Sequence, residues 1–175
     1  ITAENVAAKY GISRERQDEF ALQSQTRAAD AIANGRFEEQ IIPVGDFTTD
    51  EHPRQTSAEK LAGLRPSFAK EGTVTPGNSS GINDAAAALV LTGESGLKDF
   101  GLNPLAKIVS WGVAGCDPKY MGLGPTVAVP RALDKAGLKL SDIKLIESNE
   151  AFAAQAIAVS DELGFDNDKT NINGG

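Results

Sequence analysis

The chain is organised around the stretch Ile143-Lys144-Leu145-Ile146-Glu147-Ser148-Asn149-Glu150-Ala151-Phe152-Ala153-Ala154-Gln155-Ala156. Its first part, residues 143–148, alternates apolar and polar side chains, which predicts a β-strand. From Glu150 the composition becomes rich in alanine, which predicts a helix that ends near Gly164. Asn149 would then end the strand and cap the helix, at the edge of an open α/β sheet, where ligands commonly bind.

Two interpretations of Asn149 follow from this pattern. Asparagine is a favoured N-cap, and a glutamate in the first turn, here Glu150, complements the helix dipole. Alternatively, the amide faces a ligand at the end of the strand. Spacing alone favours the structural interpretation.

Composition restricts the class of protein. The chain has 175 residues, of which 41% are hydrophobic, 23% charged and 6% aromatic, which indicates a soluble globular protein with a sizeable core. The net charge of −7 argues against a nucleic-acid surface, and no apolar run is long enough to span a membrane. The single cysteine cannot form an internal disulfide, which is typical of a reducing compartment. Because the chain begins at Ile1 and stops at Gly175 within a motif, we expect an internal fragment.

Helices and strands are predicted to alternate along the chain, which implies an α/β fold with a parallel sheet. The charged residues at the start of the second helix, 14–19, predict a solvated face. Cap residues and apolar periodicity predict helices at residues 2–9, 14–34, 56–64, 92–100 and 126–136, and strands at 41–44, 85–92, 106–112, 143–148 and 169–173.

A segment rich in glycine, serine and asparagine, residues 71–84, predicts a loop. It lacks the spacing of a P-loop, so a mononucleotide site of that kind is not expected. Its freed backbone amides suit a polar ligand, but a plain connector fits the composition equally well.

Two other residues have side chains that could take part in catalysis or metal binding, but the case for such a role is weaker. His52 is the only histidine and lies among carboxylates, but nothing nearby completes a metal site, so a surface loop is the better interpretation. Cys116 lies in a glycine-rich loop beside Asp117, without the cation or helix N-terminus that activates a thiol. We expect it to be a structural thiol.

The string Asn149-Glu150-Ala151-Phe152 resembles a signature of the thiolases, which make or cleave 3-ketoacyl-coenzyme A thioesters. Other thiolase-like motifs occur in order along the chain, so the resemblance extends from Thr2 to the last residue. They are Leu64-Arg65-Pro66-Ser67-Phe68, Glu71-Gly72-Thr73-Val74-Thr75-Pro76-Gly77-Asn78-Ser79-Ser80-Gly81, Met121-Gly122-Leu123-Gly124-Pro125 and Asn171-Ile172-Asn173-Gly174-Gly175.

The resemblance implies a thiolase-type α/β fold, in which two βαβαβ halves with parallel-dominated sheets carry an inserted loop domain. By this resemblance, residues 1–81 belong to the coenzyme A-binding loop domain. Residues 82–101 would supply the last strand and helix of the N-terminal half, and residues 102–175 the first part of the C-terminal half. The fold is therefore expected to be incomplete in this chain.

The resemblance also implies acyl transfer through a cysteine acyl-enzyme. It places the acyl-accepting cysteine before Ile1, and the catalytic histidine and a second cysteine after Gly175. Residues 1–175 are therefore expected to be inactive alone. Of the central catalytic residues only Asn149 is expected here, where it would hold a water in the oxyanion hole that stabilises an enolate.

A groove for coenzyme A is the other implied feature, and apolar side chains with a few polar points suit such a ligand. Ordinary core packing is the alternative for the large apolar members of the set, and Arg54 is a weaker candidate for a coenzyme phosphate. The predicted coenzyme A-binding residues are Leu64, Phe68, Pro76, Ser79, Ser80, Met121, Ala151 and Phe152.

The function implied by the resemblance is that of an acetyl-CoA C-acetyltransferase, which joins two acetyl-CoA molecules into acetoacetyl-CoA and free coenzyme A. Coenzyme A thioesters would be substrates, with no metal or separate cofactor. The full-length protein would be a cytoplasmic homo-oligomer, a dimer or tetramer, without nucleic-acid or membrane partners. The alternatives are a degradative 3-ketoacyl-CoA thiolase, a thiolase-like lipid-binding protein that has lost catalysis, and a folding or interface piece with no ligand.

Overall fold

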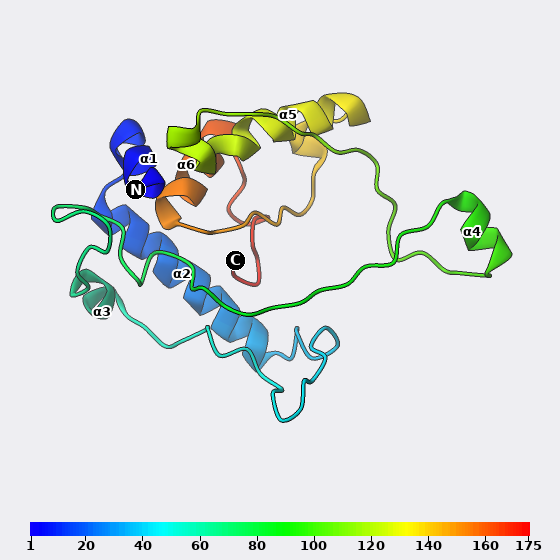
Figure 1. Ribbon diagram of the computed structural model, residues 1–175, viewed down its shortest axis with the longest axis horizontal. Helices are drawn as coiled ribbons and strands as arrows, with labels where there is room; N and C mark the ends of the chain where they lie inside the picture. Colours follow the sequence, from blue (N-terminus) through cyan, green and yellow to red (C-terminus); the bar gives the residue numbers. More distant parts are fainter.

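The computed structural model describes residues 1–175 as a cluster of helices from which one long arm extends (Figure 1). The cluster contains five α-helices and two 3-10 helices, and the arm carries α4 at its tip. In chain order the elements are α1 (Thr2–Tyr10), α2 (Arg14–Ala33), α3 (Ala58–Ala62), α4 (Glu94–Asp99), η1 (Pro118–Leu123), α5 (Gly124–Ala136), η2 (Leu140–Asp142) and α6 (Ala153–Leu163).

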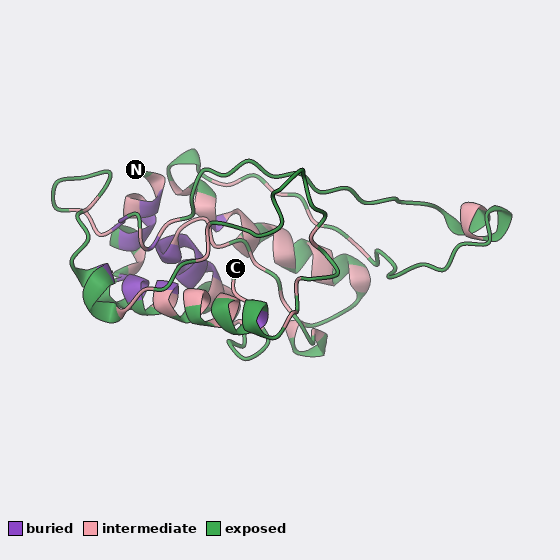
Figure 2. Cartoon of the chain, turned by 90° about the horizontal axis from the view of Figure 1, so that it is seen from below, coloured by how far each residue is buried: buried purple, intermediate pink, exposed green.

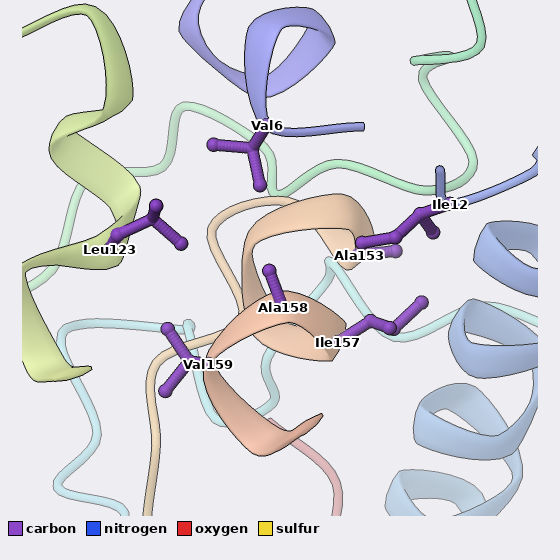
Figure 3. Close-up of a cluster of buried hydrophobic side chains, with 7 residues drawn as sticks. All are labelled: Val6, Ile12, Leu123, Ala153, Ile157, Ala158 and Val159. Atoms are coloured by element: carbon purple, nitrogen blue, oxygen red, sulfur yellow. The ribbon is translucent and has the colours of Figure 1, made fainter. Parts of the chain in front are cut away.

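The core lies around α6. All residues of this helix from Ala153 to Val159 are buried, because α1, α2, α5 and η1 pack against it. Gln155 is the only polar residue among residues 153–159, and a helical segment that is apolar on nearly every side is typical of a buried central position, where small alanines allow close packing. Figure 3 shows how α1, η1 and α6 contribute to one apolar cluster, which consists of Val6, Ile12, Leu123, Ala153, Ile157, Ala158 and Val159.

Glycine signals predict where α1, α5 and α6 end, whereas cap signals predict only some of the helix starts, and Ile1 rather than Thr2 occupies the N-cap position of α1. Ser13 caps α2, since its side chain accepts a hydrogen bond from the backbone of Arg16 at 3.2 Å. Gly11 and Gly137 end α1 and α5 in the left-handed conformation. Thr56 and Glu59 match a capping box in the sequence, but this prediction is wrong by one residue, because the side chain of Ser57 caps α3.

The predicted start of α6 is wrong. The helix begins at Ala153, not at Glu150, and Phe152 occupies the N-cap position without a side-chain cap. The backbone of residues 151–153 is instead held extended by hydrogen bonds to the loop at residues 78–80. Asn149 therefore does not cap the helix.

The strand predictions are wrong for residues 1–175, in which no strand forms. A strand requires a partner for its backbone groups, and these segments have almost none. Val44 pairs only with Phe47, within a tight turn. One remnant of parallel pairing exists, an isolated bridge between Ile146 and Thr170.

Residues 81–109, which include the arm, are exposed apart from Gly96 and Leu97 of α4, which are intermediate (Figure 2). Ile82 and Leu105 are fully exposed, and Val90 is 92% exposed. The segment that follows the arm lies against α5, where Ser110 donates a hydrogen bond to the carbonyl of Ala132 at 2.6 Å. No helix combines the length and apolar character needed to cross a bilayer.

A hydrogen bond from the hydroxyl of Tyr10 to the carboxylate of Glu162 joins α1 to α6. This bond, with smaller contributions from burial and from the charge of Glu162, raises the pKa of Tyr10 from 10.0 to about 12. A raised tyrosine pKa stabilises the fold fully below pH 10.0, and this contribution is lost as the pH rises through about 12. We therefore expect Tyr10→Phe to flatten the loss of stability over that interval.

The measurement is the urea midpoint of the full-length gene product at several values within this pH interval. Tyr120→Phe is the matched control, because Tyr120 packs against α6 without a hydrogen bond to a carboxylate. If the urea midpoints of wild type and Tyr10→Phe fell equally steeply as the pH rises through this interval, the assignment would be contradicted.

Candidate active site

A pocket of about 250 Å³ opens between the start of α1, the junction of η1 and α5, and residues 148–155. It brings together four of the residues predicted from sequence, namely Asn149, Met121, Ala151 and Phe152. The complete lining is Thr2, Ala3, Val6, Met121, Gly122, Pro125, Ser148, Asn149, Ala151, Phe152 and Gln155.

Asn149 offers its amide to this pocket. The residues on either side of it are engaged, since Ser148 and Glu150 both bind the side chain of Asn171. The Asn149 side chain itself is exposed and takes part in no hydrogen bond of residues 1–175. A neutral amide with both donors free, on a fixed backbone, suits the binding of a water or of a substrate oxygen.

The loop at residues 71–81 lies directly beside the pocket. The backbone N–H of Ser80 donates to the carbonyl of Ala151 at 2.9 Å, and that of Ala153 donates to Asn78 at 2.9 Å. An antiparallel bridge joins Ser79 to Phe152. This segment therefore forms one wall of the region around the pocket, although its side chains do not line the pocket itself.

The predicted coenzyme A-binding residues outside the pocket form an adjoining surface. The ring of Phe68 meets that of Phe152 edge-on, with centroids 6.2 Å apart. Leu64 and Phe68 are 36% and 47% exposed, so core packing does not explain them. Pro76 and Ser80 are exposed as well, whereas Ser79 is partly buried.

Met121 is 64% exposed at the pocket. The hydroxyl of Ser79 donates to the carbonyl of Thr75 at 2.7 Å, so it is already used in a hydrogen bond within the loop. Of the two loop serines, Ser80 thus has the hydroxyl that is free for a ligand.

A buried polar network holds this loop on α2, and the sequence interpretation missed it. Asp18 is 6% exposed, not solvated as expected. One of its carboxylate oxygens accepts from Arg14 Nε at 2.7 Å, and the other accepts from Asn78 Nδ2 at 2.9 Å. The Oδ1 atom of Asn78 accepts in turn from the backbone of Thr75 at 2.8 Å. No local signal marks the burial of Asp18, because Asn78 lies 60 positions away in the sequence.

A second carboxylate fixes the start of the same loop. Glu4, on α1, accepts hydrogen bonds from the backbone N–H groups of Thr73 and Val74 at 3.0 and 2.9 Å. It also accepts from the hydroxyl of Thr73 at 3.1 Å. Charge-assisted bonds of this kind are about twice as strong as neutral ones, so the loop is rigidly attached to α1 as well as to α2.

The remaining candidates lie outside this site. The Cys116 thiol is 3.7 Å from the carbonyl oxygen of Met121, as expected of a structural loop thiol, and does not line the pocket. His52 lies against Gly81 in a surface loop. No group of three or more histidine, cysteine, aspartate or glutamate side chains is arranged to hold a metal ion.

Comparison with known proteins identifies the class of protein. The family model described as the thiolase N-terminal domain matches residues 1–95, and that of the thiolase C-terminal domain matches residues 102–175. The chain therefore belongs to the thiolase family, as its motifs predicted.

Individual relatives are enzymes of this family. The chain is 55% identical to the acetyl-CoA acetyltransferase of Escherichia coli (strain K12), over 100% of the chain and 47% of that protein. A solved structure of an acetyl-CoA acetyltransferase from Syntrophomonas wolfei superposes with a TM-score of 0.95 at 46% identity, over 100% of the chain and 47% of that structure. Human mitochondrial 3-ketoacyl-CoA thiolase superposes with a TM-score of 0.91 at 46% identity, over 100% and 46%.

The chain thus has a thiolase-type α/β fold and spans about half the length of the curated relatives that it matches. The predicted fold class is confirmed, although the sheets of that fold do not form among residues 1–175. The finer division at residues 81 and 101 remains a prediction.

Two buried glutamines provide a matched test of the packing around the pocket. Gln155 lines the pocket and is 6% exposed, yet its Oε1 atom has no hydrogen-bond partner. Gln17 also has an unpartnered Oε1, but its Nε2 donates to Thr73 Oγ1 at 2.9 Å and to the carbonyls of Ile12 and Ser13. Loss of buried hydrogen bonds costs about 1–3 kcal/mol, whereas removal of an unpaired polar group is nearly neutral.

We expect Gln17→Met to lower the free energy of unfolding of the full-length gene product by about 1–3 kcal/mol. Gln155→Met should change it by less than about 1 kcal/mol, because methionine keeps the volume and removes only an unpaired amide. Urea unfolding measures both. A loss for Gln155→Met as large as that for Gln17→Met would show that a group outside residues 1–175 binds the Gln155 amide.

Proposed function

We propose that the full-length gene product is an acyltransferase, an acetyl-CoA C-acetyltransferase that reversibly joins two acetyl-CoA molecules into acetoacetyl-CoA and coenzyme A through a cysteine acyl-enzyme. The observation that carries the proposal is the meeting of Asn149, Met121 and Phe152 in one pocket. The 55% identity to an acetyl-CoA acetyltransferase supports it. Residues 1–175 alone would be inactive, because Cys116, their only cysteine, does not line the pocket.

In this proposal Asn149 stabilises the enolate that forms when carbon–carbon bond formation begins. Negative charge develops on the enolate oxygen, and a fixed neutral donor lowers the energy of that state without a competing charge. The Asn149 amide would hold a water at this position. Its exposure at the pocket and its lack of any other hydrogen bond support this role.

We further propose that coenzyme A lies across the surface adjoining the pocket, with its acyl end inside. Apolar contacts from Leu64, Phe68 and Pro76 suit the pantetheine chain, and the free hydroxyl of Ser80 suits one of its amides. Met121, Ala151 and Phe152 would surround the acyl end. The partly buried Ser79 would support the loop from behind.

The broader features of the proposal follow the family. Coenzyme A thioesters are the substrates, no separate cofactor is needed, and the full-length protein is a homo-oligomer without nucleic-acid or membrane partners. A cytoplasmic location is consistent with a single cysteine that cannot form an internal disulfide. By the same resemblance, residues 1–81 form part of the coenzyme A-binding loop domain.

The test is a thiolysis assay of the full-length gene product, with acetoacetyl-CoA and a medium-chain 3-ketoacyl-CoA measured side by side. We expect turnover of acetoacetyl-CoA and little turnover of the longer substrate. Efficient cleavage of the longer substrate would move the protein to the degradative thiolases. Turnover of neither substrate would indicate a non-catalytic, thiolase-like lipid-binding protein.

Asn149→Ala tests the mechanism in the same assay. Removal of one oxyanion donor typically lowers kcat by about 10²–10³-fold, and we expect a loss in this range with little change in the KM for coenzyme A. Steady-state kinetics separate the two effects. A KM that rises in proportion to the fall in kcat would show that Asn149 only supports the pocket wall.

A further inference from the structure

Resting on the proposed function, we propose that Asn171 is the positioning residue that aims the Asn149 amide at the reacting oxygen. Asn171 is 2% exposed and does not line the pocket, so it would act only through the backbone that it binds. It lies 22 residues after Asn149, beyond α6, which is why spacing alone does not connect the two.

The Asn171 side chain binds both backbone polar groups of Ser148, the residue immediately before Asn149. Its Oδ1 atom accepts from the N–H of Ser148 at 2.7 Å, and its Nδ2 atom donates to the carbonyl of Ser148 at 2.7 Å. The second N–H of the amide donates to Glu150 Oε1 at 2.6 Å. One side chain thus fixes the residues on both sides of Asn149 and uses three of its four hydrogen-bonding positions.

The backbone of Asn171 adds a further bond, since its N–H donates to the carbonyl of Ile146 at 2.9 Å. Asn171 adopts φ 47°, the left-handed conformation, and it is the only non-glycine residue of the chain with a positive φ. Backbone strain of this kind persists only where the surrounding contacts impose it, and it is concentrated at functional sites.

Helix α2 helps to hold the left-handed conformation of Asn171. Arg27 donates to the carbonyls of Asn167 and Thr170 at 2.8 Å each, and to that of Asn171 at 3.4 Å. The position next to this anchor is equally close-packed, because a Cβ atom on Gly175 would lie 2.3 Å from Asn171 Nδ2. A residue larger than glycine at position 175 would therefore displace the Asn171 amide.

The consequence is a fixed direction for the Asn149 side chain. Catalysis by a preorganised donor depends on its placement before the reaction, and a shift of about 1 Å can cost about 10²-fold in rate. Loss of the Asn171 amide would free the backbone at Ser148 and Glu150 and let Asn149 move. It would leave the coenzyme A surface at Leu64, Phe68 and the 71–81 loop untouched.

The test is a double-mutant cycle on kcat in the thiolysis assay of the full-length gene product. Asn171→Gly keeps the left-handed backbone and removes the amide. We expect it to lower kcat by about 10- to 100-fold with the KM for coenzyme A changed by less than about twofold. In an Asn149→Ala background the same substitution should lower kcat by no more than about twofold, since the residue that it positions is gone.

Asn173→Ala is the matched control, because Asn173 is also an asparagine of this segment but binds only Arg36, with its Oδ1 atom 2.6 Å from Nη1. Its kcat should remain within about twofold of the wild type. Asn171→Asp is a second variant that keeps the size and the acceptor but places a carboxylate against Glu150, and it should also lower kcat. The urea midpoints of all variants establish that each is folded.

Several results would overturn the inference. One is an unchanged kcat for Asn171→Gly in an active wild-type background, and another is equal effects of that substitution with and without Asn149. A loss confined to KM would also overturn it. An inactive wild type would instead overturn the proposed function, so the two failures are distinguishable.

Discussion

The hydrogen bond between the buried carboxylate of Asp18 and the amide of Asn78 is the interaction on which the rest of the site depends. Through Asn78 it fixes Thr75 and, by way of the Asn78 carbonyl, the backbone of Ala153 at the start of α6. Through Arg14 it extends to the carbonyls of Leu61 and Leu64, at 2.7 and 2.9 Å. Removing the partner of a buried polar group typically costs about 1–3 kcal/mol, and more for a charged group, so this network is a strong constraint on three of the predicted substrate-binding segments.

Helix α2 supports the site at two separate places along its length. Near its start, Arg14 and Asp18 hold the 71–81 loop, which belongs to the proposed coenzyme A surface. Farther along, Ser24 binds both backbone groups of Gly175, and Arg27 binds the segment before it. The same helix thus connects the proposed coenzyme A surface with the segment that holds the Asn149 amide. Figure 1 shows α2 running past both regions.

Features encoded by neighbouring residues were predictable from the sequence, and those that depend on distant partners were not. Ser13 and Gly11 mark helix ends because a cap needs only its own turn. The start of α6 could not be predicted in this way, since the loop that holds residues 151–153 lies more than seventy positions earlier. The burial of Asp18 could not be either, because a charge near the start of a helix usually faces solvent.

The candidate site residues were chosen from sequence motifs and not from local cap or periodicity signals. Asn149 carries no distinctive spacing, and local rules assigned it to a cap that the structure does not form. Its motif is a different kind of signal, because a motif records the contacts of a whole fold rather than those of one turn, and Asn149 lines the pocket. Asn171 belongs to another such motif, yet its role became visible only when its bonds to Ser148 and Glu150 were known.

The contrast between the arm and the helical cluster explains why half of a thiolase fold can still contain an ordered pocket. Leu89 and Val90 are about as exposed as in an extended peptide, because the strand pattern of the arm has no partner within residues 1–175. The pocket does not depend on that pattern. Its walls are joined by side chains such as Glu4 and Asn171, which bind backbone groups directly and need no sheet. The geometry around Asn149 is therefore determined by this chain, whereas the sheets of the fold require partners that the chain does not contain.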